Sequence, residues 1–104
     1  MKSVKVTYTT KPEYAAQNQR NIQTVMSDLQ RLAHRGINYN ACLSADNKTF
    51  VHSAFFQSDD DEKILNNLPS FKSFQEQLKA SGPETPPKLE VLTLVGSSAA
   101  IFES

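Results

Sequence analysis

The chain is poor in the residue types that build metal, disulfide and phosphate sites. Its 104 residues include one cysteine, two histidines, three glycines and no tryptophan. A single cysteine excludes an internal disulfide framework and a cysteine-rich metal site. The three glycines are too widely spaced to form a phosphate-binding loop. Neither histidine has carboxylates spaced around it as a metal site requires, so we expect no metal and no cofactor.

The chain also lacks an excess of charge of either sign. Eleven lysine and arginine residues balance eleven aspartate and glutamate residues, which gives a formal net charge of zero. A nucleic-acid binder needs a basic excess that displaces counterions, and a membrane-surface module needs a basic face. The longest apolar runs are far shorter than a membrane span, and residues 1–5 do not resemble a signal peptide. We expect a cytoplasmic protein with neither nucleic acid nor membrane as a partner.

The first half of the chain predicts a strand, a long helix and a hairpin. Polar and apolar residues alternate over 3–10, which is typical of a half-buried strand. Thr10, with Glu13 three residues later, is expected to cap a helix that runs to about residue 34, and Gly36 is expected to end it. Two further strands, 37–45 and 48–57, are expected to be joined by a two-residue turn at Asp46 and Asn47.

The second half predicts two helical pieces and a last strand. The acidic run that follows Ser58 suits a helix start, where the macrodipole favours carboxylates, and we expect it to be solvated. Pro69 interrupts this helix, Ser70 is expected to cap a second piece, and that piece ends before Gly82. A proline-rich loop at 83–87 and a strand at 89–95 follow. We expect one domain over residues 1–97 and a C-terminal tail at 98–104.

This order predicts an α+β fold of the ferredoxin-like βαββαβ type, a four-stranded antiparallel sheet with helices on one face. If the hairpin has no bulge, the numbers of two residues that lie directly opposite each other on its strands sum to 93. One side of the hairpin is then bulky and apolar and should face the helices, while the other mixes polar and apolar residues. That mixed composition favours a homodimer that packs sheet against sheet, and the alternative is a monomer with a modestly apolar wet face.

Several polar residues are expected to meet between the sheet and the helices. His52, Tyr8 and Tyr39 share the helix-facing side, and Asn18 interrupts the apolar stripe of the first helix. Apolar walls with a few convergent polar groups are typical of a small-molecule site. His52 could act there as a general base or hydrogen-bond donor; alternatively, it is a structural histidine bonded to a tyrosine or a backbone carbonyl. The expected walls are Phe50, Phe56, Phe71 and Phe74.

Three segments carry a resemblance to a known family: the opening strand with Tyr8–Tyr14, the hairpin strand with Thr49–His52, and the helix with Leu68–Phe74. With them the chain resembles the dimeric α+β barrel superfamily, and within it the antibiotic biosynthesis monooxygenase-like proteins. The resemblance implies a dimeric barrel and a small aromatic ligand. The chain differs from the haem-degrading members of this superfamily. They place a histidine on the helix before the last strand, and the corresponding segment here, residues 71–78, has no histidine.

The resemblance implies a small-molecule-binding homodimer that oxygenates an aromatic or quinone-like substrate without a cofactor. The quinone-forming oxygenases of the superfamily use tryptophan, and this chain has none. The alternative is a non-catalytic module for dimerisation or ligand sensing. Cys42 is expected on the sheet face opposite His52, so the two cannot form a nucleophilic dyad. Fold-level likeness alone is weak evidence for a reaction.

Overall fold

The chain forms the predicted order of strands and helices. A computed structural model describes residues 1–102, so the end of the expected tail, residues 103–104, lies outside the described residues. Within the described part, no helix is long and apolar enough to cross a bilayer. The elements are β1 (Lys2–Thr9), a 3₁₀ turn (Pro12–Tyr14), α1 (Ala15–Leu32), β2 (Ile37–Leu43), β3 (Thr49–Phe56), α2 (Asp59–Asn66), α3 (Pro69–Ser81) and β4 (Thr85–Leu92).

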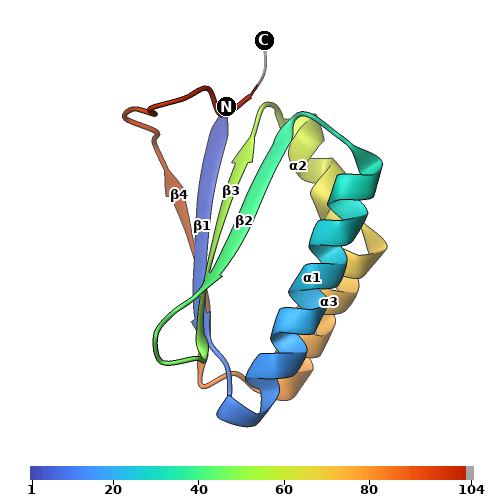
Figure 1. Cartoon of the computed structure of the whole chain (residues 1–104), viewed down its shortest axis with the longest axis vertical. Coiled ribbons are helices and arrows are strands. Elements are labelled where there is room, and N and C mark those ends of the chain that lie inside the picture. The colour runs from blue at the N-terminus through green and yellow to red at the C-terminus, as the bar shows by residue number, and fades with distance from the viewer. Residues whose placement is uncertain (103–104) are drawn as a thin grey trace.

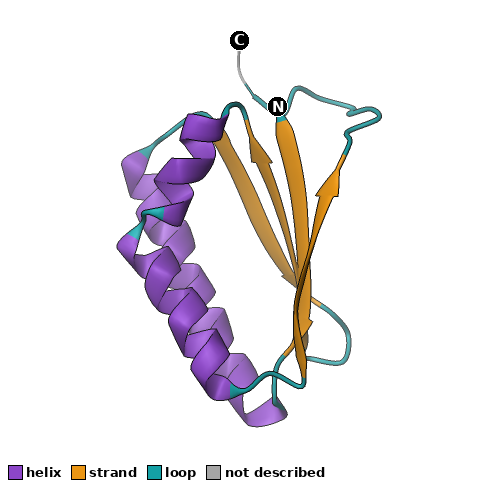
Figure 2. Ribbon diagram, turned by 180° about the vertical axis from the view of Figure 1, so that it is seen from behind, coloured by secondary structure: helices purple, strands orange, loops and turns teal. Residues whose placement is uncertain are grey.

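The four strands form one antiparallel sheet in the order β2-β3-β1-β4. The helices lie on one face of it, and β4 is the edge strand farthest from them (Figure 1). The view from behind shows the same two layers, which converge near the β2–β3 loop and diverge toward the other end (Figure 2). The architecture is therefore the expected ferredoxin-like α+β fold, with one sheet face left without helices.

The register of the β2–β3 hairpin is as predicted, although its turn is not. Leu43 lies opposite Phe50 and Tyr39 opposite Ala54, so opposed numbers sum to 93. The expected two-residue turn is wrong, because the backbone N–H of Asn47 donates to Ser44 and only Asn47 has a positive φ, of 64°. The register survives because the N–H of Ser44 still donates to the carbonyl of Thr49, at 2.8 Å.

The expected caps of the first helix are wrong at both ends. Thr10 does not cap it: its hydroxyl and its N–H both donate to the carbonyl of Lys48 beside the hairpin. The helix ends at Leu32, and Ala33, not Gly36, takes the left-handed conformation, with φ 53°. A left-handed residue is common at this position, where its N–H satisfies carbonyls of the last turn.

The later boundaries also differ from the prediction. Leu68 precedes α3 and Pro69 occupies its first turn, so Ser70 is not the cap, and its hydroxyl has no hydrogen-bond partner among the described residues. The expected proline-rich loop is wrong, because Thr85 already pairs with Thr9 and β4 ends at Leu92. Prolines are tolerated there because β4 is an edge strand and its register shifts beside them.

Gly36 lies against a polar cluster that connects the α1–β2 loop to α2. A Cβ on Gly36 would overlap the carboxylate of Asp61. That carboxylate contacts His34 Nε2 at 2.5 Å and accepts a hydrogen bond from the Ser58 hydroxyl at 2.7 Å. Asp61 is buried, so the prediction that the acidic run is solvated is wrong for this residue. The hydrogen bonds from His34 and Ser58 hold the pKa of its carboxyl below the ordinary value.

We predict that Asp61→Asn destabilises the protein at pH 7 and that the difference from wild type shrinks in acid. A carboxyl with a lowered folded pKa stabilises the fold above its unfolded pKa of about 3.9, and this contribution is lost as the pH falls through the folded value. Urea unfolding of wild type and variant from pH 7 to pH 3 measures the difference in their free energies of unfolding. Asp60→Asn, on the same turn but exposed, is the control. Equal effects of the two substitutions at every pH would contradict the prediction.

Candidate functional site

A cavity of about 170 Å³ lies between the sheet and the helices α2 and α3. Apolar side chains from both layers dominate its walls, and such walls are typical of a small-molecule site. It is open, and Pro87 and Leu89 of β4 belong to its lining. Six residues expected from the sequence meet in it: Tyr8, Tyr39, His52, Phe56, Phe71 and Phe74.

A chain of hydrogen bonds runs beneath this cavity. His52 Nε2 lies 2.8 Å from the hydroxyl of Tyr8, and His52 Nδ1 lies 2.5 Å from the hydroxyl of Tyr39. The amide nitrogen of Asn18 donates to the Tyr8 hydroxyl at 2.8 Å. The chain therefore joins β1, β2, β3 and α1, and both imidazole nitrogens are engaged by tyrosines.

The hydrogen-bonded side chains are neutral at pH 7. Burial lowers the pKa of His52 to about 4, because the apolar surroundings disfavour the imidazolium. Burial also raises the pKa of Tyr8 and of Tyr39 far above the ordinary phenol value. The floor of the cavity thus offers hydrogen bonds without charge.

Aromatic packing fixes the orientation of these rings. Tyr39 meets Phe71 edge-on, with ring centroids 6.1 Å apart, and His52 lies 5.5 Å from Phe74. Edge-on and offset arrangements are the favourable ones for aromatic pairs. The aromatic residues of α3 therefore hold the floor from the helical side.

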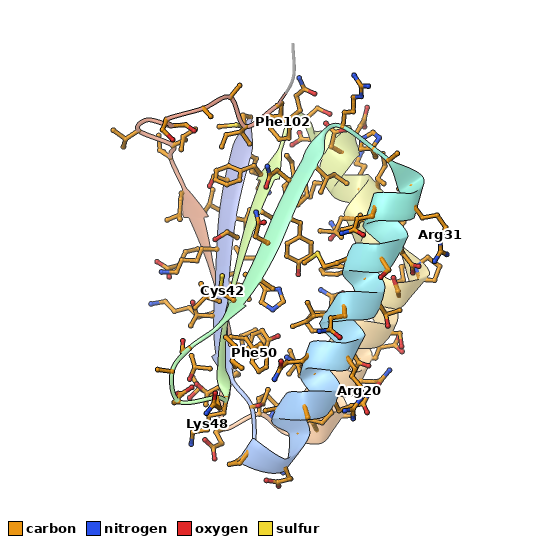
Figure 3. All side chains as sticks on the ribbon, viewed as in Figure 1. Arg20, Arg31, Cys42, Lys48, Phe50 and Phe102 are labelled. Atoms are coloured by element: carbon orange, nitrogen blue, oxygen red, sulfur yellow. The ribbon has the colours of Figure 1, made fainter. Side chains whose placement is uncertain are left out.

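Two of the expected site residues lie outside the cavity wall. Phe50 is stacked on Tyr8, with centroids 5.5 Å apart, and lies in the core between the sheet and α1 (Figure 3). Asn18 is fully buried behind Tyr8 and acts on the cavity only through that tyrosine. Both residues support the polar floor from beneath and are absent from the lining of this cavity.

Sequence reasoning did not identify the polar groups on the helical side of the cavity. Glu62 and Asn66 of α2 and Gln75 of α3 line it, and Glu62 forms an ion pair with Lys2 of β1 at 2.9 Å. Charged and amide residues on exposed helix turns look like ordinary solvent-facing positions in a sequence. The spacing of Leu65, Phe71 and Leu78 predicted the apolar face of the helices. The polar residues next to that face were the signal that could have identified Glu62, Asn66 and Gln75.

Cys42 lies opposite Val51 on the sheet face away from the helices, as the register predicted. Its side chain is exposed, and the sheet separates it from His52. Among residues 1–102, no three histidine, cysteine, aspartate or glutamate side chains gather in a group able to hold a metal ion.

The fold is shared with solved structures of antibiotic biosynthesis monooxygenase-like proteins, which confirms the expected resemblance. Rv0793 of Mycobacterium tuberculosis is 15% identical, with a TM-score of 0.78 over 94% of this chain and 98% of its own. A candidate antibiotic biosynthesis monooxygenase of Nitrosomonas europaea is 13% identical, with a TM-score of 0.78 over 92% and 100%. A variant of SnoaB, a cofactor-independent oxygenase of Streptomyces nogalater, is 13% identical, with a TM-score of 0.71 over 95% and 97%.

These likenesses establish the architecture, since sequence identity is low in each case. No protein-family model matches the chain, and no curated protein matches its sequence significantly. Function has to be argued from the site itself.

We predict that the His52 imidazole titrates with a midpoint near pH 4 and stays neutral at pH 6, because burial penalises its charged form. Proton–nitrogen NMR of the imidazole signals measures this, with His34→Asn leaving His52 as the single histidine. Circular dichroism at each pH verifies that the protein is folded. A midpoint at the ordinary histidine value, about 6.5, would contradict the prediction.

Proposed function

We propose, on a fold shared with the antibiotic biosynthesis monooxygenase-like structures, that this protein binds an aromatic or quinone-like molecule and oxygenates it without a cofactor. The observation that carries the proposal is the open apolar cavity whose floor is the neutral Tyr8–His52–Tyr39 group. Apolar walls favour a flat aromatic ligand, and a few fixed polar groups orient it. The same features suit dioxygen, which is itself apolar.

The proposed reaction inserts one oxygen atom at an activated carbon of the substrate. A phenol or an aromatic ketone with an acidic C–H passes a proton to water at the open side of the cavity, and the resulting anion passes one electron to O₂. The radical and superoxide combine to a peroxide anion, which takes a proton back from water, then loses a water molecule and leaves a carbonyl. One atom of O₂ becomes the carbonyl oxygen and the other leaves as water, and the substrate carbon supplies all four electrons.

His52 acts in this scheme through the tyrosine hydroxyls, because both of its nitrogens already contact them. Hydrogen-bond donors held in an apolar site stabilise negative charge that develops on a substrate oxygen. His52 is therefore a positioning residue: it orients and polarises the hydroxyl that faces the ligand.

We also propose that the protein is a homodimer that packs the helix-free faces of two sheets together. This face alternates between polar and apolar side chains, and Cys42 on it is exposed. Leu92 on the edge strand β4 pairs with Ser3 on this face and is exposed as well. A second copy of the chain would bury such a mixed surface, whose composition resembles that of a protein interface.

We predict that the purified protein consumes O₂ with anthrones or naphthalenediols and that His52→Ala abolishes turnover while ligand binding persists. The reason is that the truncated side chain no longer polarises the tyrosine hydroxyl, whereas the apolar walls remain. An oxygen electrode measures uptake, and mass spectrometry with isotopically labelled O₂ follows the label into the product.

The control for this substitution is His34→Ala, which removes the histidine outside the cavity. Turnover of His52→Ala at the wild-type rate would refute the role of His52. Binding of these aromatics without O₂ uptake by the wild type would instead favour a ligand-sensing module.

We predict that Val51→Glu converts the dimer to a monomer. Val51 lies on the helix-free face of the central strand β3 between Cys42 and Thr7, and a carboxylate there would lose its water in the proposed interface. Light scattering after size-exclusion chromatography should give about twice 11.6 kDa for the wild type and 11.6 kDa for the variant. Gln23→Glu, on the exposed side of α1, is the control and should remain dimeric. A monomeric wild type would refute the dimer.

A further inference from the structure

The hydrogen atoms in the chain beneath the cavity can be assigned from its first donor. The Asn18 amide nitrogen donates to the Tyr8 hydroxyl, so the Tyr8 oxygen accepts there. Tyr8 is 1% exposed, and within the described part of the chain its own hydrogen has one acceptor within reach, His52 Nε2 at 2.8 Å. Tyr8 therefore donates to Nε2 of the imidazole.

This donation decides the tautomer of His52. A neutral imidazole carries one hydrogen, and the nitrogen without it is the acceptor. Because Nε2 accepts from Tyr8, the hydrogen lies on Nδ1. Nδ1 then donates to the oxygen of Tyr39, 2.5 Å away.

The Tyr39 hydroxyl is left with a hydrogen of its own and no protein acceptor. Within residues 1–102, His52 is the one hydrogen-bond partner of this hydroxyl. Tyr39 lines the cavity, and its ring is fixed against Phe71. The donors thus run in one direction, from Asn18 through Tyr8 and His52 to Tyr39, and the last hydrogen is available to an occupant of the cavity.

We infer that Tyr39 donates a hydrogen bond to an acceptor oxygen of the ligand, so that the cavity selects carbonyl-bearing aromatics, ketones or quinones, over aromatics whose polar group is only a donor. The inference rests on the proposed binding of an aromatic molecule in this cavity. Successive hydrogen bonds polarise one another, which makes the terminal Tyr39 hydrogen a better donor than that of an isolated phenol. A donor-only ligand offers no acceptor to the Tyr39 hydrogen and leaves that hydrogen unpaired.

The first test is the tautomer of His52 in the free protein, which requires no ligand. Nitrogen NMR of the His34→Asn variant at pH 7 should show the hydrogen on Nδ1 and an unprotonated Nε2. A hydrogen on Nε2 would overturn the inference. The Asn18 amide would then face Tyr8 with its oxygen, and Tyr39 would donate inward to Nδ1.

The second test compares three bicyclic probes of similar shape: α-tetralone, an acceptor; indole, a donor; and tetralin, which has no polar group. Isothermal titration calorimetry gives the dissociation constants for wild type and for Tyr39→Phe. The affinity of α-tetralone relative to tetralin should fall about three- to tenfold in Tyr39→Phe, as expected for one lost neutral hydrogen bond. The relative affinity of indole should not fall. Tyr14→Phe, a tyrosine outside the cavity, is the control and should match wild type.

The outcomes separate this inference from the proposed function. If wild type and Tyr39→Phe bind α-tetralone and tetralin in the same ratio, the cavity binds aromatics but Tyr39 does not select carbonyls. A wild-type preference for indole over α-tetralone would also overturn the inference. If wild type binds none of the probes, the proposed binding function fails first, and the tautomer measurement still decides the direction of the chain.

Discussion

The imidazole of His52, bonded at both nitrogens to tyrosine hydroxyls, is the contact on which this site depends. It connects β3 to Tyr8 on β1 and Tyr39 on β2, and through Tyr8 to Asn18 on α1. A neutral imidazole donates at one nitrogen and accepts at the other, so both imidazole nitrogens are paired in apolar surroundings without charge. A one-residue slip of β3 would turn His52 to the opposite face and leave several buried polar atoms unpaired, each at a cost of about 1–3 kcal/mol.

The one-sided placement of the helices explains both the cavity and the exposed apolar surface. The helical layer lies nearest β2 and diverges from the sheet at one end, and β4 lies farthest from it (Figures 1 and 2). Leu89 and Val91 share the helix-facing side with Val6 and Val4, their β1 neighbours, yet they are 63% and 65% exposed. The cavity reaches this uncovered strand through Leu89. The opening of the cavity and the exposed apolar side chains of β4 thus have the same cause, the placement of the helices away from β4.

The local alternation of polar and apolar residues was enough to predict the sheet and most of the residues that form the floor of the cavity. The parity of the hairpin placed His52 and Tyr39 on one face and Cys42 on the other. The polar break at Asn18 predicted a side chain that is either hydrogen-bonded or near solvent, and the structure shows the hydrogen-bonded case. The turn and the helix caps were missed in local detail, and two other misses depend on approaches between distant segments. The contact of Gly36 with Asp61 needs α2 beside the α1–β2 loop, and pairing with β1 draws Thr85 into a strand despite the prolines that follow it.

The likeness in fold to a cofactor-independent oxygenase constrains shape more than chemistry, since the identity is 13%. The chemistry must come from what this chain places at the cavity floor, a neutral donor chain beneath apolar walls. Under the proposed function, such a floor would stabilise negative charge on a ligand oxygen more than it stabilises the neutral ligand, because the donors are fixed in advance. An aromatic carbonyl whose enolate reacts with O₂ gains from that difference. A carbonyl compound with no acidic C–H gains orientation alone. Under the proposed function, the site would therefore bind such a compound without changing it and would oxygenate only the carbonyl compound that forms an enolate.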